Sequence, residues 1–280
     1  MTVADLSSQA LISLALADAF PNDAIVGEED GALLRTDGAG TIAIEVLGHV
    51  ERARPGISFG RVVDALDRCG HPGGPTGRFW TLDPVDGTKG FLRGGQYAVA
   101  LALVEDGEVV LGVLGCPNLD GSLFVAERGH GAWTEALEGN GRSQPLAVHP
   151  PAMVSEARLA ESVESGHSAL DDGARVAALL GLRSASLRID SQAKYATVAR
   201  GETQIYLRLP TDPTYRERIW DHAAGWLLVT EAGGTVTDIR GRAFDFGSGR
   251  RLERNDGVVA TSGGALHEAV LGAVTQVLEG

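Results

Sequence analysis

The pattern of apolar and polar residues predicts helices at the start of the chain. Residues 4–20 repeat apolar side chains at helical spacing, and the Pro-Asn-Asp that follows ends the pattern. We expect a helix here, opened by Asp5 as its cap. Residues 41–66 mix apolar and charged positions and predict one or two further helices, broken at residues 54–60, RPGISFG.

The next part of the chain has the pattern of antiparallel β-structure. Residues 79–83, FWTLD, predict a strand that ends at the following Pro84, because proline cannot donate to a sheet. Residues 96–116 contain two long apolar runs that meet at Asp106-Gly107, a strong hairpin signal. Residues 121–135 predict another pair of short strands.

After a polar stretch at 138–145 the pattern changes to alternating helices and strands. Helices are expected at 171–182, 190–201, 221–234 and 265–280, and strands at 184–190, 203–210, 234–241 and 256–263. We therefore predict an N-terminal α+β domain at 1–144 and a C-terminal α/β domain at 145–280.

Composition and charge narrow the class of protein. Apolar residues make up 44% of the 280 residues, which is typical of a globular protein. The net charge of −13 argues against a nucleic-acid or acidic-membrane binder. The two cysteines form no disulfide framework, and the sequence shows no signal peptide or membrane span, so we expect a cytoplasmic protein.

The sequence LDPVDGT at 82–88 is the first candidate for chemistry. It is compatible with a surface turn, because Asp, Pro and Gly dominate turns. It also places Asp83 and Asp86 at the end of a strand, with the Val85 carbonyl between them. Carboxylate and carbonyl oxygens are the ligands that Mg²⁺ prefers, so a metal site is the alternative to a simple turn.

Two further acidic turns follow apolar segments. Glu28 lies in VGEED at 26–30, and Asp221 lies in IWDHAAG at 219–225. Asp221 alone could be the N-cap of the next helix. Taken together, the three separated acidic turns are typical of a site in which several metal ions clamp a phosphate and activate water.

These motifs resemble the inositol monophosphatase superfamily, and within it the bisphosphate nucleotidases. DPVDGT and WDHAAG look like the whole superfamily, while TKGFLRGGQYAVALAL at 88–103 and DSQAKYATVARGETQIYLRLP at 190–210 look like the nucleotidase branch. The resemblance runs from Thr2 to the C-terminal helix and implies a layered α/β/α/β/α sandwich. It also implies lithium inhibition.

The resemblance assigns roles to particular residues. It implies that two or three Mg²⁺ ions are held by Glu28, Asp83, Asp86, Asp221 and the carbonyl of Val85. Thr88, paired with Asp5, would orient and deprotonate the attacking water, since a hydroxyl between a carboxylate and a water can relay a proton. The backbone amides of Gly87 and Thr88 would bind phosphate oxygens.

The substrate side of the resemblance is cationic. It implies that His167, Ser191, Lys194, Arg208 and Asp221 bind the nucleotide, with charge-assisted contacts to a second phosphate. Each cation also has a structural alternative. Lys194 could pair with Asp190 within one helix, Arg208 could be a solvated strand residue, and His167 a loop histidine.

The implied activity is Mg²⁺-dependent removal of the 3'-phosphate of adenosine 3',5'-bisphosphate. Whether 3'-phosphoadenylyl sulfate is also a substrate stays open. The alternatives are an inositol phosphate phosphatase on the same scaffold, or an inactive metal- or nucleotide-binding protein. The expected partner is a small phosphorylated nucleotide, with no nucleic acid and no membrane, and we expect a monomer rather than a dimer.

The region around Asp5 departs from the resemblance. Family members carry a helical segment before the motif TVAD, whereas here only Met1 precedes it. We therefore expect Asp5 to lie near a free terminus, where its role with Thr88 is the least secure of the site assignments.

Overall fold

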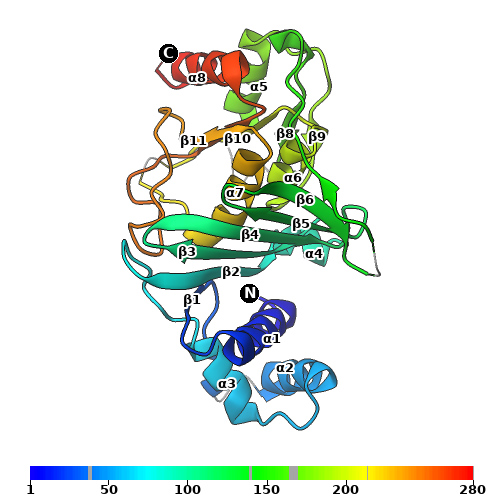
Figure 1. The fold of residues 1–280 in the computed structure, drawn as a ribbon, viewed down its shortest axis with the longest axis vertical. Helices are drawn as coiled ribbons and strands as arrows, with labels where there is room; N and C mark the ends of the chain where they lie inside the picture. Colours follow the sequence, from blue (N-terminus) through cyan, green and yellow to red (C-terminus); the bar gives the residue numbers. More distant parts are fainter. Residues whose placement is uncertain (37–39, 139–140, 164–169, 213, 280) are drawn as a thin grey trace.

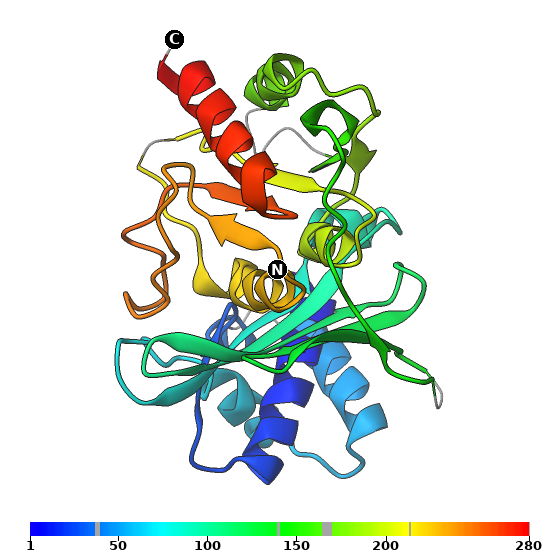
Figure 2. The same cartoon turned by 45° about the horizontal axis from the view of Figure 1, so that its top comes forward.

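The protein is seen in a computed structural model that describes residues 1–36, 40–138, 141–163, 170–212 and 214–279. Helices and sheets alternate in layers: a group of helices, a seven-stranded sheet, a pair of helices, a five-stranded sheet and a second pair of helices (Figures 1 and 2). The α/β/α/β/α sandwich implied by the resemblance is confirmed.

Three helices form the N-terminal layer, and they are α1 (Val3–Ala19), α2 (Gly40–Ala53) and α3 (Phe59–Asp67). The expected break between two helices is confirmed. The prediction that Asp5 caps α1 is wrong, because Thr2 is the cap and its hydroxyl accepts from the Asp5 amide at 3.3 Å. The Asp5 carboxylate in turn accepts from the Thr2 amide, which completes a capping box.

The first sheet contains β1 to β7 in chain order: β1 (Ala24–Gly27), β2 (Arg78–Asp86), β3 (Ala98–Glu105), β4 (Glu108–Cys116), β5 (Ser122–Glu127), β6 (Gly131–Ala136) and β7 (Gln144–Pro145). β1 runs parallel to β2, and each later neighbour is antiparallel. The hairpin at Asp106-Gly107 is confirmed, since both residues have positive φ, of 49° and 80°.

The second sheet has the order β11-β12-β10-β8-β9. Its strands are β8 (Leu159–Glu161), β9 (Leu187–Arg188), β10 (Ile205–Arg208), β11 (Thr235–Thr237) and β12 (Val258–Thr261). The sequence pattern did not predict β8. The sheets change over after Pro145, while the division into domains at residue 144 stays a prediction.

The remaining helices are α4 (Thr88–Leu92), α5 (Leu170–Leu179), α6 (Ala193–Ala199), α7 (Ala223–Glu231) and α8 (Gly264–Glu279). α6 and α7 lie between the two sheets, and α5 and α8 cover the outer face of the second sheet (Figure 2). α7 is apolar around most of its circumference, as expected for a helix buried on both sides. Among the described helices, none is long and apolar enough to cross a lipid bilayer.

Candidate active site

A cavity of about 880 Å³ is lined by residues of both sheets and of the segments between them. Its walls come from the ends of β1 and β2, the start of α4, the 3-10 turn η5 (Ile219–Asp221), α6 and β10. It brings together the sequence-predicted residues Glu28, Asp83, Val85, Asp86, Gly87, Thr88, Ser191, Lys194, Arg208 and Asp221. Asp5 is buried outside this lining, and His167 lies outside the described residues.

A bulge in β2 places both aspartates of the first acidic turn in the cavity. The predicted end of this strand at Pro84 is wrong, because β2 continues to Asp86. Asp83 pairs with Ala100 and Asp86 with Ala98, so β2 has one extra residue in this interval. Side chains three apart in a regular strand point to opposite faces, and the extra residue restores them to one side.

Helix α1 holds the two acidic turns at the ends of β1 and β2. The Ser8 hydroxyl donates to the Pro84 carbonyl at 3.1 Å. The Gln9 side chain donates to the Glu29 carbonyl at 2.6 Å and accepts from the Glu29 amide at 3.0 Å. The first helix of the chain therefore fixes the backbone that carries Glu28 and Asp83.

Gln192, which sequence reasoning missed, connects three walls of the cavity. Its amide donates to the Asp86 carboxylate, and its side chain donates to the Trp220 carbonyl at 2.8 Å. The same side chain accepts from the Gly225 amide of α7 at 3.1 Å. Its place in the DSQAK motif was the signal available from the sequence, but its partners lie far along the chain.

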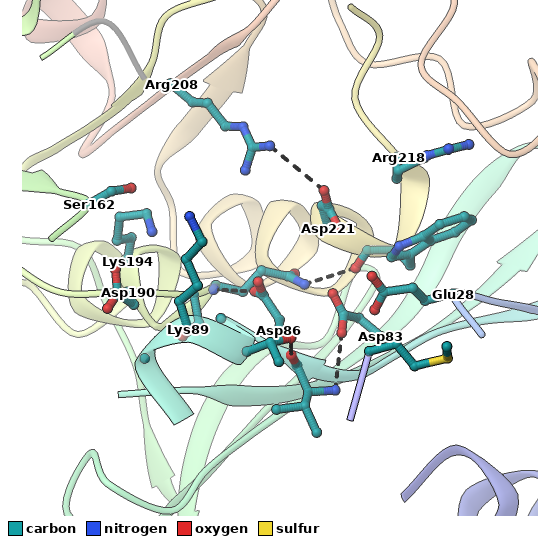
Figure 3. A pocket seen from close by; sticks show the side chains of 18 of the residues that line it. Glu28, Asp83, Asp86, Lys89, Ser162, Asp190, Lys194, Arg208, Arg218 and Asp221 are labelled. Atoms are coloured by element: carbon teal, nitrogen blue, oxygen red, sulfur yellow. Dashed lines mark hydrogen bonds and ion pairs between the residues drawn. The ribbon is translucent and has the colours of Figure 1, made fainter. Parts of the chain in front are cut away.

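The carboxylates Glu28, Asp83, Asp86 and Asp221 lie close enough in the cavity to repel one another. Figure 3 shows Glu28 and Asp83 side by side, with Asp221 facing them. Burial, followed by the charge of Asp221, raises the pKa of Glu28 to about 8. Burial and the charge of Glu28 raise the pKa of Asp83 well above its usual value. Burial also raises the pKa of Asp221 to about 6, against the opposing charge of Arg208.

This donor set fits divalent cations. Hard oxygen ligands converge from separate turns, and a bound cation would favour the ionised form of Glu28, Asp83 and Asp221, whose pKa values are raised by burial and by neighbouring acids. Asp221 does not cap α7, because it lies in η5 and His222 precedes the helix. The alternative that explained Asp221 as a helix cap is therefore excluded.

A second group of possible metal ligands has another explanation. Ligand atoms of Glu217, Asp221 and His222 all lie within 4.8 Å of one another. However, both ring nitrogens of His222 are engaged, at 2.9 Å from the Tyr195 hydroxyl and 3.2 Å from Glu217. Glu217 itself is paired with Arg208. His222 therefore has no lone pair left for a metal ion.

Among the described residues, Lys194 is one of five cationic residues that line the same cavity as the acids, the others being Lys89, Arg208, Arg218 and Arg250. Lys194 is only 5% exposed, and its Nζ contacts the Ile189 carbonyl at 3.5 Å and the Tyr206 ring at 5.2 Å from the centroid. The alternative pairing with Asp190 is not made, because Asp190 pairs with Arg93 at 2.5 Å. Burial lowers the pKa of Lys194 to about 8.

Thr88 and Asp5 occupy separate hydrogen-bonding environments. The Thr88 hydroxyl donates to the Val85 carbonyl at 3.1 Å. The Asp5 side chain is buried, and its Oδ1 has no hydrogen-bond partner in the structure. Gly87 precedes α4 with φ of 85°, and an added Cβ there would lie 3.0 Å from the Cβ of Ser191. The tight approach of these two backbones requires glycine.

The layered fold, with acidic turns meeting cations between two sheets, defines the class of metal-dependent phosphatases built on this sandwich. The chain belongs to the inositol monophosphatase family, whose sequence model matches residues 1–279. The family expected from the sequence motifs is therefore confirmed.

The curated relatives include 3'(2'),5'-bisphosphate nucleotidases. That of Emericella nidulans is 45% identical and covers 100% of this chain and 88% of its own length. That of Schizosaccharomyces pombe is 42% identical over 96% of this chain and 82% of its own length. That of Oryza sativa is 45% identical over 94% of this chain and 80% of its own length. The expected likeness to the nucleotidase branch is confirmed.

Solved structures with the same fold are more distant in sequence. The Thermotoga maritima IMPase is 24% identical, with a TM-score of 0.64, and covers 96% of this chain and 80% of its own. Mycobacterium tuberculosis SuhB is 21% identical, with a TM-score of 0.62, and covers 98% of this chain and 91% of its own. These structures establish the fold.

Proposed function

We propose that the protein is a Mg²⁺-dependent phosphatase that removes the 3'-phosphate of adenosine 3',5'-bisphosphate. One observation carries the proposal: Lys194 and Arg208 line the same cavity as Glu28, Asp83, Asp86 and Asp221. In a chain of net charge −13, five cations in the lining of an acidic cavity, Lys194 and Arg208 among them, are suited to a second anionic group on the substrate. The names of the relatives from three organisms support the same activity.

The acidic residues would hold the metal. Glu28, Asp83, Asp86, Asp221 and the Val85 carbonyl are the proposed ligands for two or three Mg²⁺ ions. When bound, Mg²⁺ neutralises phosphate charge and makes a nearby water molecule more acidic. The pKa values of Glu28 and Asp83 are raised by burial and then by the charges of neighbouring acids, and they support this assignment because a bound cation would offset both causes.

Thr88 and Asp5 are the proposed pair that orients the attacking water. Thr88 lines the cavity, and the buried Oδ1 of Asp5 has no hydrogen-bond partner among the described residues. The amides of Gly87 and Thr88 would contact the oxygens of the phosphate that is cleaved. These roles rest on the resemblance.

The other end of the cavity would hold the second phosphate. Arg208 offers a planar set of donors and Lys194 a point charge, while Ser191 contributes a polar wall. An inositol monophosphate carries one phosphate and could not use this end. We therefore expect the cations to favour a bisphosphate nucleotide.

A substrate panel tests the proposal. Phosphate release is measured from adenosine 3',5'-bisphosphate, 3'-AMP and inositol 1-phosphate, with and without Mg²⁺. We expect kcat/KM to be about 10- to 100-fold higher for the bisphosphate than for 3'-AMP, because each lost charge-assisted contact costs about 1.5–3 kcal/mol. Preference for the inositol ester would contradict the proposal, and nucleotide binding without turnover would favour an inactive binding protein.

The metal assignment has a separate test in Asp86→Asn. The substitution keeps the size of the side chain and removes a proposed ligand, so turnover should fall more than about 100-fold, beyond the loss typical of a residue that only supports a ligand. Asp256→Asn, outside the cavity, is the matched control and should retain turnover. Unchanged turnover in Asp86→Asn, at any Mg²⁺ concentration, would sink the metal mechanism.

A further inference from the structure

Arg208 forms an ion pair with Glu217, a buried acid that the sequence motifs did not single out. Glu217 is 6% exposed, and its two carboxylate oxygens accept from Nε and Nη2 of Arg208, each at 2.8 Å. Burial would raise the pKa of Glu217, but the charge of Arg208 and the hydrogen bond from His222 outweigh it and lower the pKa to about 2. The acid is therefore ionised and fully paired.

Glu217 is fixed in turn by hydrogen bonds that run through the buried side chains of His222 and Tyr195. His222 has no exposed surface, and its Nε2 lies 3.2 Å from Glu217, while its Nδ1 lies 2.9 Å from the Tyr195 hydroxyl. An ionised carboxylate can only accept, so Nε2 donates. In the neutral ring, Nδ1 then accepts from the Tyr195 hydroxyl. The Tyr195 ring packs directly against Gly225, since a Cβ added there would lie 2.2 Å from the ring.

This arrangement decides which edge of the guanidinium faces the cavity. Glu217 uses Nε and one proton of Nη2, which leaves Nη1 and the second Nη2 proton as donors. Arg208 Nη2 also lies 3.8 Å from the Asp221 carboxylate (Figure 3). Without Glu217, Asp221 would be the nearest acid to draw Arg208 toward the proposed metal ligands.

We propose that Glu217, supported by His222 and Tyr195, is a positioning residue that orients Arg208 toward the second phosphate of the substrate and so sets selectivity for a bisphosphate. The inference rests on the proposed function and deepens it. An Arg208 guanidinium that is already oriented loses less conformational entropy when it binds the second phosphate. Loss of Glu217 should therefore weaken binding of the second phosphate more than it slows the chemical step.

The test compares two substrates that differ in one phosphate. In Glu217→Gln, KM for adenosine 3',5'-bisphosphate should rise about tenfold, with a smaller change in kcat, and the ratio of kcat/KM between the bisphosphate and 3'-AMP should fall about tenfold. Tyr195→Phe removes only the far hydroxyl and should lower the same ratio about two- to threefold. Thermal melting of each variant reports folding independently.

Glu202→Gln is the matched control, because Glu202 is bonded to Arg200 in a similar pair outside the cavity. It should leave the ratio unchanged. In the double variant Arg208→Lys with Glu217→Gln, the ratio should fall no further than in Arg208→Lys alone, because Glu217 acts through Arg208.

The outcomes separate the two proposals. A wild-type enzyme without preference for the bisphosphate would overturn the proposed function, and this inference with it. A wild-type preference that survives in Glu217→Gln, or an equal loss on both substrates, would overturn the role of Glu217 alone.

Discussion

At the scale of single residues, the cavity gathers charges of both signs. Glu28 and Asp83 have raised pKa values and Lys194 a lowered one, and burial is the largest cause in each case. Each group is therefore poorly stabilised in its charged form until a ligand of opposite charge arrives. A phosphorylated substrate and a divalent cation are such ligands.

Lys194 gives the site a testable pH dependence. With its pKa near 8, the amine is charged below that pH and neutral above it. At saturating Mg²⁺, kcat/KM for adenosine 3',5'-bisphosphate should fall about tenfold per pH unit above about 8, because the free enzyme loses a contact to the second phosphate. The pH profile of kcat/KM measures this.

Lys194→Met is the control for this limb of the profile. It should have a lower kcat/KM that no longer falls in this range. A wild-type profile that stays flat to pH 9, or a Lys194→Met profile that keeps the decline, would show that another group titrates.

The motifs allowed part of the site to be predicted from local sequence. Asp83 and Asp86 are three residues apart at the predicted end of a strand, and this position indicated that both could bind the same metal site. Gln192 and Glu217 were not predicted, because their importance lies in their partners. Gln192 contacts Asp86 across 106 positions of the chain, a relation that no local pattern contains.

At the scale of elements, the close approach of α6 and α7 places the substrate residues. α6 carries Lys194, and α7 begins two residues after Asp221. Gly225 of α7 lies against Tyr195 of α6, and a side chain at this position would collide with the ring. The two helices also lie between the sheets, so neither can move away without disturbing a core.

Gly225→Ala tests this packing. The added methyl group should destabilise the protein by about 1–3 kcal/mol, because the surrounding core cannot relax freely. Gly272→Ala in the exposed face of α8 is the control, since its Cβ would meet nothing within 4 Å. It should stabilise by about 0.5–1 kcal/mol through helix propensity. Urea unfolding measures both, and equal effects would contradict the packing argument.

The periodicity of apolar residues predicted the longer helices and strands, but it missed features that depend on pairing with a neighbouring strand. α1, the hairpin of β3 and β4, and α8 follow from local pattern. β2 was predicted to end at Pro84. The bulge that accommodates this proline exists only in the pairing of β2 with β3, so the local sequence does not show it. β8 has three residues and is stabilised by β10 and β9 on its two sides.

At the scale of the whole molecule, the acidic cluster couples metal binding to stability. The pKa values of Glu28, Asp83 and Asp221 are raised in the folded protein, so without metal the folded state binds more protons than the unfolded state. This contribution to stability is fully present below about pH 4 and is lost as pH rises through about 8.

Mg²⁺ should therefore stabilise the protein more at high pH. At pH 8 and about 100 times the dissociation constant, Mg²⁺ should add about 2.7 kcal/mol to the free energy of unfolding. At pH 5 it must displace protons from the same carboxylates and should add less. Melting temperatures with and without Mg²⁺ at the two pH values measure the difference.

Two controls accompany this experiment. NaCl at matched ionic strength accounts for screening, and Glu28→Gln should lose much of the pH dependence, since Glu28 has the pKa raised to about 8. An equal Mg²⁺ effect at both pH values in the wild type would show that the acidic cluster does not bind the ion.

The sequence by itself determined the residue types, the alternation of elements and the family motifs. These are local properties, because turn chemistry, periodicity and motif spacing act over a few residues. Tertiary structure alone decided that the ends of β1 and β2, η5, α6 and β10 meet in one cavity. It also decided that Glu217 holds Arg208 and that Gln192 holds Asp86, because burial and charge are properties of neighbours in space.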